Sequence, residues 1–208
     1  MYHTVHFSRM TGKNPRGKLL DAAIDHIAAR GISDLSLREL AAAIGTSHRM
    51  LIHHFSSREA LWVEVIRAVE ARQRALLADV VPEAGATVGD VLRQWWAHIS
   101  DASLWPNERL FFEIYGQALQ GRPGTVELLD GIVDSWIEPG AAGFEAFGVP
   151  RPEALAQARL GIAVSRGLLL DLLATGDRAA VDAAMEAYIA LVEAGLARYS
   201  GSKPADRS

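Results

Sequence analysis

The 208-residue sequence contains no cysteine, and this absence excludes several classes of function. A chain without thiols forms no disulfide, holds no thiolate zinc site and offers no cysteine nucleophile. A long apolar run is also missing, because the most apolar stretch, Leu160–Ala174, contains Ser165, Arg166 and Asp171. It is too short and too charged to span a bilayer, and residues 1–18 lack the apolar segment of a signal peptide. We therefore expect a cytoplasmic protein that does not enter the membrane.

Runs of alternating β-branched residues between hairpin turns are missing too, so no strand is expected. Apolar residues recur instead at helical spacing, which predicts an all-α fold. The glycine-rich stretch Pro139–Pro152 is expected to be an irregular connection between helices. The predicted helices are Arg16–Arg30 with Gly31 as its cap, Ser36–Gly45, Ser47–Phe55, about Ser57–Val80 before Pro82, Val88–Ser100, one from Pro106, one containing Leu128, Leu129, Ile132 and Trp136, Pro152–Thr175 and Arg178–Tyr199.

Two stretches have the S-x-x-E pattern of a helix capping box, in which a hydroxyl and a carboxylate bind the backbone N–H groups at a helix start. The first pairs Ser36 with Glu39 and begins the second helix. The other pairs Ser56 with Glu59 and predicts the start of the fourth helix. These boxes fix the boundaries of the N-terminal helices more closely than apolar periodicity does.

The second and third predicted helices, joined at Gly45, have the pattern of a helix-turn-helix unit. Ile44, Leu51 and Phe55 should close its core against the first helix. The residues between them on the third helix should then face outward, and these are His48, Arg49, Ile52 and His53.

Charge is divided unevenly along the chain, whose net charge is −4. Residues 1–60 hold eight Lys/Arg against five Asp/Glu, whereas the remaining residues hold thirteen against twenty. Six of the seven histidines also lie in the first sixty residues. A basic N-terminal part on an acidic body indicates that only the N-terminal part meets a polyanion.

The third helix, in GTSHRMLIHHF (Gly45–Phe55), carries three histidines and an arginine. A metal site is disfavoured because His48 and His53 are five residues apart, not three or four, and the segment has no carboxylate. Acid–base catalysis needs a partnered histidine in a cleft, which a solvent-facing helix does not offer. The alternative is that these residues simply form a solvated polar face. Contact with nucleic acid fits best, because imidazoles donate to phosphate oxygens and Arg49 can pair with guanine.

The segment LSLRELAAAIGTSHRMLIHHFSSREAL (Leu35–Leu61) resembles the helix-turn-helix of the tetracycline-repressor (TetR) family of transcriptional regulators. LLDAAIDHIAARGISD (Leu19–Asp34) is similar to that family's first helix and turn, and SRGLLLDLLATGD (Ser165–Asp177) to its penultimate helix. The resemblance implies an all-helical homodimer with a DNA-binding head over residues 1–60 and a ligand-binding and dimerisation domain over 61–200. Residues 201–208 are expected to be a disordered tail.

The resemblance and the outward positions together predict which residues contact double-stranded DNA. Ile52 stands where the family usually has a tyrosine, so that phosphate-binding hydroxyl is missing. Arg49 replaces a commonly small residue and is a candidate for reading guanine, while Met50 is suited to a thymine methyl. The predicted DNA-binding residues are Ser36, Arg38, Ser47, His48, Arg49, Met50, His53, His54 and Arg58.

The C-terminal part is rich in aromatic residues, which are either simply core or the walls of a ligand cavity. Two adjacent pairs, Trp95-Trp96 and Phe111-Phe112, favour a cavity because both members of a pair cannot face one helix stripe. No glycine-rich nucleotide motif or metal-helix motif is present, so no cofactor is expected. Glu113 and Arg122 could add polar contacts to the predicted ligand-binding residues, which are Trp95, Trp96, His98, Phe111, Phe112, Tyr115 and Trp136.

The last two helices are apolar on more than one side, which predicts a homodimer with a four-helix seam. The alternative is that Pro139–Pro152 covers this face within one chain. The residues predicted at the seam are Gly161, Ser165, Leu169, Leu173, Tyr188 and Val192.

These features favour a TetR-like repressor that a small apolar or aromatic ligand releases from a pseudo-palindromic operator. A regulator of the same fold controlled by a protein partner, or by no ligand, is the alternative. A helical enzyme is more remote, because no nucleophile–base pair or carboxylate pair is placed to support one.

Overall fold

A computed structural model of the chain describes residues 14–30, 35–78 and 85–199. Within these ranges the chain forms helices and no strand, which confirms the predicted all-α fold. None of the described helices combines the length and the apolar character needed to cross a membrane. The elements are α1 (Pro15–Arg30), α2 (Leu37–Ala43), α3 (His48–Phe55), α4 (Arg58–Ala78), α5 (Val88–Ile99), η1 (Ala102–Leu104), α6 (Trp105–Leu119), η2 (Val126–Leu129), α7 (Asp134–Ala146), α8 (Arg151–Thr175) and α9 (Arg178–Leu196).

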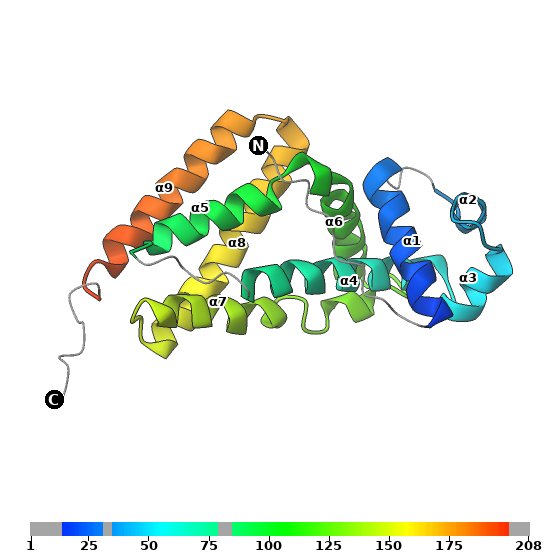
Figure 1. Cartoon of the computed structure of the whole chain (residues 1–208), viewed down its shortest axis with the longest axis horizontal. Coiled ribbons are helices and arrows are strands. Elements are labelled where there is room, and N and C mark those ends of the chain that lie inside the picture. The colour runs from blue at the N-terminus through cyan, green and yellow to red at the C-terminus, as the bar shows by residue number, and fades with distance from the viewer. Residues whose placement is uncertain (1–13, 31–34, 79–84, 200–208) are drawn as a thin grey trace.

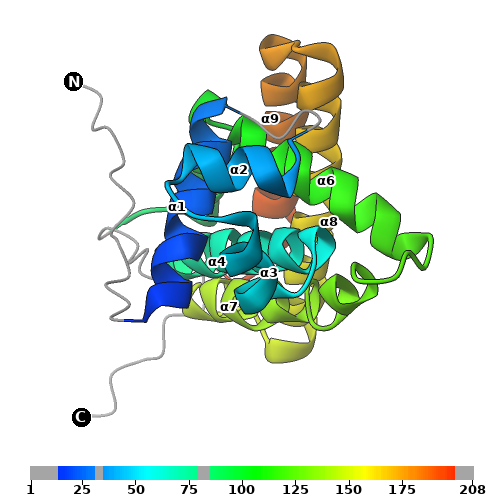
Figure 2. The same ribbon diagram turned by 90° about the vertical axis from the view of Figure 1, so that its right-hand side faces the viewer.

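Helices α1, α2 and α3 form the helix-turn-helix head at one end of the molecule (Figures 1 and 2). The predicted capping box is present at α2, where the Ser36 hydroxyl accepts from the Glu39 amide and the Glu39 side chain binds the Ser36 amide. Gly45 adopts a φ of +71°, which lets the chain turn sharply between α2 and α3. Leu51 and Phe55 are buried in the core with α1, as predicted.

The predicted start of the fourth helix is wrong by one residue. Ser57, not Ser56, caps α4, and its hydroxyl accepts from the Ala60 amide at 3.0 Å. Ser56 instead ends α3, with a φ of +67° and its N–H donated to the carbonyl of Ile52. Because Ser56 is already committed to the preceding helix, it cannot also adopt the extended backbone that an N-cap requires.

Helix α4 runs along the long axis of the molecule from the head into the body (Figure 1). Its buried residues Leu61, Val65 and Ile66 share one apolar core with α1 to α3 and with α6 and η2. Two cross-links between helices reinforce this packing: Arg16 of α1 binds Glu64, and Arg72 binds Asp21 at 2.5 Å. The core therefore continues across the expected domain boundary at residue 60.

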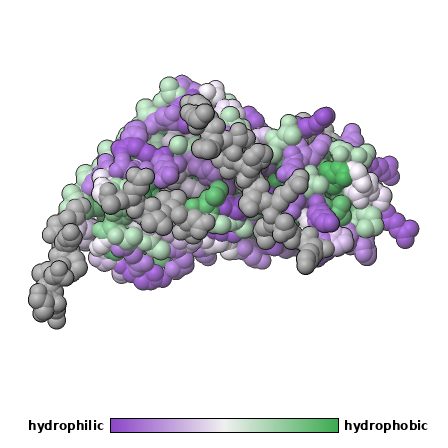
Figure 3. All heavy atoms as spheres, in the orientation of Figure 1, coloured by the Kyte–Doolittle hydropathy of each residue, from purple (hydrophilic) through white to green (hydrophobic). Residues whose placement is uncertain are grey.

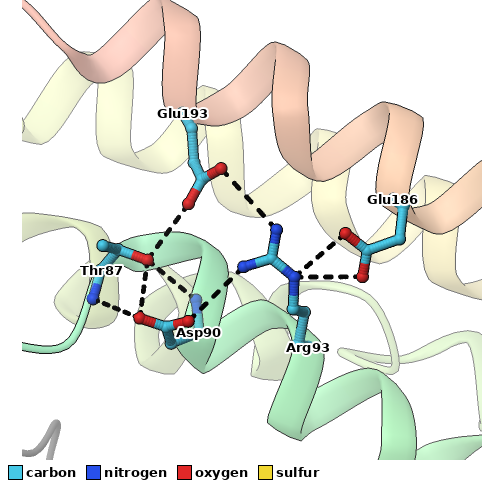
Figure 4. Close-up of polar contacts among 5 residues, drawn as sticks. All are labelled: Thr87, Asp90, Arg93, Glu186 and Glu193. Atoms are coloured by element: carbon cyan, nitrogen blue, oxygen red, sulfur yellow. Dashed lines mark hydrogen bonds and ion pairs between the residues drawn. The ribbon is translucent and has the colours of Figure 1, made fainter.

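The body has a second core, formed by α5, α7, α8 and α9. Polar side chains fasten α5 along α9 (Figure 4): the Arg93 guanidinium donates to Glu186 at 3.0 Å, and the Thr87 hydroxyl contacts Glu193 at 3.1 Å. Gly176, at a φ of +71°, ends α8 and lets α9 fold back beside it.

The stretch after Gly124 differs from the prediction. Leu128 and Leu129 lie in the short η2, and the helix that follows, α7, continues through Pro139 to Ala146. The expectation of an irregular connection over Pro139–Pro152 is therefore wrong. Proline removes one helical hydrogen bond, but α7 packs so closely on α8 that a Cβ at Gly140 would lie 3.1 Å from the Cβ of Ala158. Burial against α8 outweighs the local cost of proline and glycine.

Three sequence-based expectations lie outside the described residues. These are the cap at Gly31, the end of the fourth helix before Pro82 and the C-terminal tail at residues 201–208.

A bulky side chain at Gly140 should destabilise the protein because it must displace α8. We expect Gly140→Val to lower the free energy of unfolding by about 1–3 kcal/mol relative to Gly143→Val. Gly143 is the matched control because it lies in the same helix with open space around it. Urea denaturation measures both, and equal stabilities would contradict the close approach of α7 and α8.

Candidate DNA-binding surface and internal cavity

The outer face of α3 is exposed and polar at its N-terminal end. His48, Arg49, Met50 and His53 are all exposed, and the Ser47 hydroxyl caps the helix by accepting from the Met50 amide at 3.2 Å. Hydrophilic side chains project from the end of the molecule where α2 and α3 lie (Figure 3). Because Leu51 and Phe55 are held in the core, these side chains are presented on a fixed helix.

Helix α2 adds two predicted residues, Ser36 and Arg38, and both are exposed. The Ser36 hydroxyl lies 2.6 Å from the Glu39 carboxylate. Hydrogen bonds from the hydroxyl and amide of Ser36 lower the pKa of Glu39, so its carboxylate stays charged beside the predicted phosphate contact. Arg38 is the cation that α2 itself presents on this surface.

His54 and Arg58 are less accessible than expected. The His54 ring packs edge-on against His53 and Phe55, and its Nε2 is buried without a partner among the described residues. The His54 carbonyl accepts from Arg16 at 3.2 Å. Arg58, at the start of α4, also has a buried Nε without a partner in the part of the chain that is described. Both residues therefore belong partly to the head's own packing.

Metal binding finds no support on this surface. Among residues 14–30, 35–78 and 85–199, no three His, Asp or Glu side chains are grouped closely enough to hold an ion.

A cavity of about 340 Å³ lies inside the body, between the two apolar cores. This volume is within the range of small-molecule sites. Of the seven predicted ligand-binding residues, three line the cavity: Trp95 on α5, Phe111 on α6 and Trp136 on α7. Phe144 of α7 and Phe147, which caps the C-terminal end of that helix, complete the aromatic wall, although this segment was expected to be an irregular connection.

The other four predicted residues, Trp96, His98, Phe112 and Tyr115, are not part of the cavity lining. Trp96 is turned toward α9, where its indole N–H donates to Asp182 at 2.7 Å. His98 lies beside Trp95, and burial lowers its pKa although Asp101 acts in the opposite direction. Phe112 packs against both cores, and Tyr115 stacks on Phe111 with ring centres 5.3 Å apart. Each adjacent aromatic pair thus contributes one wall residue and one packing residue.

Four polar side chains that were not predicted as ligand-binding residues line the same cavity: the buried Glu70, Gln73 and Glu108, and the partly buried Arg166. Glu70 accepts from the Trp136 indole at 2.6 Å and faces the Arg166 guanidinium at 3.4 Å. Gln73 donates to Glu108 at 2.9 Å. Glu70 and Gln73 follow Ile66 and Val69 on the buried face of α4, and polar residues in an apolar stripe are the signal that would have revealed them.

Burial dominates the ionisation of both carboxyl groups. It raises the pKa of Glu70, against the stabilising charge of Arg166 and the indole hydrogen bond. It raises the pKa of Glu108 to about 7, opposed by the hydrogen bond from Gln73 and increased further by the charge of Glu70. The Glu108 carboxyl group is therefore partly protonated at neutral pH.

Most of the residues predicted at a dimer seam are turned toward the inside of this chain. Gly161, Ser165, Leu169 and Tyr188 line the cavity. Val192 is buried in the second core, and Leu173 is partly buried. The inner face of α8 is covered by α7. Helical periodicity shows which faces of α8 and α9 are apolar. It does not show which of these faces packs against the rest of the chain.

The opposite faces of α8 and α9 are exposed and apolar. Leu191 is the most exposed of the large apolar residues, with 74% of its surface accessible. Other exposed small or apolar side chains of the same two helices are Leu160, Ala163, Leu170, Ala183, Ala184, Ala187 and Ala194.

Comparison with known proteins matches residues 19–65 to the model of the bacterial regulatory proteins of the tetR family. The HTH-type transcriptional regulator SrpR of Pseudomonas putida is 32% identical over 103 residues, which cover 48% of this chain and 44% of SrpR. The uncharacterized HTH-type transcriptional regulator TtgW, also of Pseudomonas putida, is 31% identical over 106 residues, covering 49% of this chain and 72% of TtgW. This chain thus aligns with less than half of SrpR but with most of TtgW.

The fold is also that of solved structures. The crystal structure of a transcriptional regulator from Rhodococcus sp. RHA1 superimposes with a TM-score of 0.69 at 22% identity, covering 88% of this chain and 97% of that one. Helix-turn-helix head, connecting helix and helical body all have counterparts among known regulators. The chain belongs to the TetR family of bacterial transcriptional regulators.

Proposed function

We propose that this regulator is a homodimeric repressor that binds a pseudo-palindromic operator through α3 and is released by a small apolar or aromatic ligand in the cavity. The observation that carries the proposal is α4, which begins beside the exposed face of α3 and lines the cavity with Glu70 and Gln73. Helix α4 thus connects the proposed DNA-binding surface to the cavity.

DNA recognition is proposed for the N-terminal half of α3 together with α2. Arg49 is exposed and free to extend, so its guanidinium can pair with guanine O6 and N7 in the major groove. His48, His53, Arg38 and the Ser47 turn lie on the same surface and would position the head on phosphates.

Coupling between the sites follows from the length and contacts of α4. Glu70 lies twelve residues beyond Arg58, which is about 18 Å along the helix. A ligand between Trp95, Phe111 and Trp136 would contact Glu70 directly. It releases DNA only if it prefers a state in which α4 is displaced, and DNA must then weaken ligand binding by the same factor.

Dimerisation is proposed for the exposed face of α8 and α9 around Leu170 and Leu191. Alanine and glycine at the surrounding positions would allow the two helix pairs to approach closely and form a four-helix seam. A two-fold axis there would present two heads to two operator half-sites.

The DNA-binding proposal predicts different effects for the two arginines. Arg49→Ala should remove about 1–3 kcal/mol of base discrimination per half-site and flatten the ranking of operator variants. Arg58→Ala should weaken binding to all sequences alike, because a phosphate contact carries no base information. Mobility-shift titrations against the promoter regions of neighbouring genes measure both, with Arg151→Ala in the body as control. An unchanged operator ranking in Arg49→Ala would contradict the assignment.

The dimer proposal predicts that Leu191→Glu yields monomers, because an unpaired charge buried at the seam costs about 3 kcal/mol or more. Leu119→Glu is the control, since Leu119 on α6 has 62% of its surface accessible and lies outside the proposed seam. Sedimentation velocity distinguishes the species. A Leu191→Glu protein that sediments like the parent would place the seam elsewhere.

A further inference from the structure

We propose that the cavity selects an organic cation, an ammonium or amidinium group carried on an apolar or aromatic body. This inference rests on the proposed function only in treating the cavity as the effector site. It specifies the charge of the ligand, which the aromatic walls of the cavity alone do not determine.

The first argument is the balance of charged groups around the cavity. Two carboxyl groups and one guanidinium line it: Glu70, Glu108 and Arg166. Arg166 is already engaged, since it faces Glu70 at 3.4 Å and donates to the Ile132 carbonyl at 3.2 Å. Its guanidinium also lies over the Phe111 ring, 4.9 Å from the centre. The single positive charge is therefore matched to Glu70.

Glu108 forms no ion pair with the described part of the chain, because Arg166, which is engaged by Glu70, attracts its charge only weakly and from farther away. Its side chain is buried, with 6% of the residue's surface accessible, and its hydrogen-bond partner is the neutral amide of Gln73. A buried carboxylate without a cation is costly. An organic cation in the cavity would supply the missing charge, whereas an anion would meet two carboxyl groups and an arginine that is already paired.

The aromatic wall suits the same ligand. Ring faces attract cations, and the attraction grows when water is excluded. Arg166 lies over Phe111, and Arg74 lies 5.6 Å from the centre of Trp136. Trp95, which lies 5.4 Å from Trp136, has no guanidinium or ammonium over it among the described residues and remains open to a ligand.

A second polar anchor is the hydroxyl of Tyr188. The residue is 9% accessible, lines the cavity and finds no hydrogen-bond partner among the described residues. Gly161 faces it, where a Cβ would lie 3.1 Å from the hydroxyl oxygen. Gly161 and Arg166 are five residues apart, about 7 Å along α8. A cation that also carries a hydroxyl or carbonyl group could bind at both ends of the cavity.

The test uses three probes of one shape and three charges, measured by calorimetry on the full-length dimer. They are 3-hydroxyphenyltrimethylammonium, its neutral isostere 3-tert-butylphenol and the anion 3-hydroxybenzenesulfonate. We expect the cation to bind at least about tenfold more tightly than the neutral probe. Equal or tighter binding of the neutral probe or the anion, or no binding of any of the three, would overturn the inference.

Glu108→Gln identifies the residue responsible, because the amide keeps the shape and removes the charge. The preference for the cation should fall to about one in this variant, whereas Glu127→Gln, at an exposed position of η2 outside the cavity lining, should keep it. Thermal unfolding by circular dichroism confirms that both variants are folded. A preference that survives in folded Glu108→Gln would overturn the assignment to this carboxylate.

Binding of the cation should also release protons from Glu108, and this release can be measured independently of affinity. Burial raises the pKa of this carboxyl group to about 7, and a bound cation would favour its charged form. The cation should therefore bind more tightly as the pH rises from 6 to 8, and should release about half a proton at pH 7. The other charged or titratable groups that face the cavity or its carboxylates are Glu70 and Arg74 of α4, Arg166 of α8 and Tyr188 of α9.

Calorimetry in buffers of different ionisation enthalpy measures this release. Glu108→Gln should abolish it, and release that persists in that variant would assign the proton to another group. Displacement of operator DNA is measured separately. If the cation binds preferentially but does not displace DNA, the inference about ligand charge stands and the proposed release by a ligand is overturned. If the neutral probe binds preferentially and displaces DNA, release by a ligand stands and the inference about charge is overturned.

Discussion

The buried carboxylate of Glu70 joins three helices, and the arrangement of the body around the cavity depends on it. It belongs to α4, it accepts the indole N–H of Trp136 on α7, and it faces Arg166 on α8. A charge removed from water is stable only when such partners surround it. The head, which shares its apolar core with α4, is therefore tied through one side chain to the walls of the cavity.

The head could be predicted almost completely from the sequence because its signals are local. The Ser36–Glu39 box, the glycine turn and the outward position of Arg49 depend on residues within a few positions of one another. The start of α4 was misplaced because Ser56 and Ser57 offer the same hydroxyl, and only the end of α3 decides between them. Helix α7 was missed because Pro139 and Gly140 argue locally against a helix, whereas contact with Ala158 across the chain favours one.

The cavity could be predicted only in part, for a related reason. Aromatic pairs indicated a cavity in the body, but periodicity does not say which member of a pair faces it, and Trp96 turned out to bind Asp182. The same ambiguity placed Tyr188 at a seam, whereas it lines the cavity. Glu70 meets Trp136 and Arg166 across 66 and 96 residues of sequence, so no local pattern shows the polar group that they form.

The two surfaces of recognition share no residue. The exposed side chains of α3 make no contribution to the cavity wall, and the cavity residues make none to the outer face of the head. Under the proposed function, substitutions on α3 would change the DNA sequence that is bound without changing the ligand, and substitutions in the cavity would change the ligand without changing the DNA sequence. Helix α4 is the exception. It shares a core with the head and lines the cavity, so a substitution on its buried face would affect both proposed sites at once.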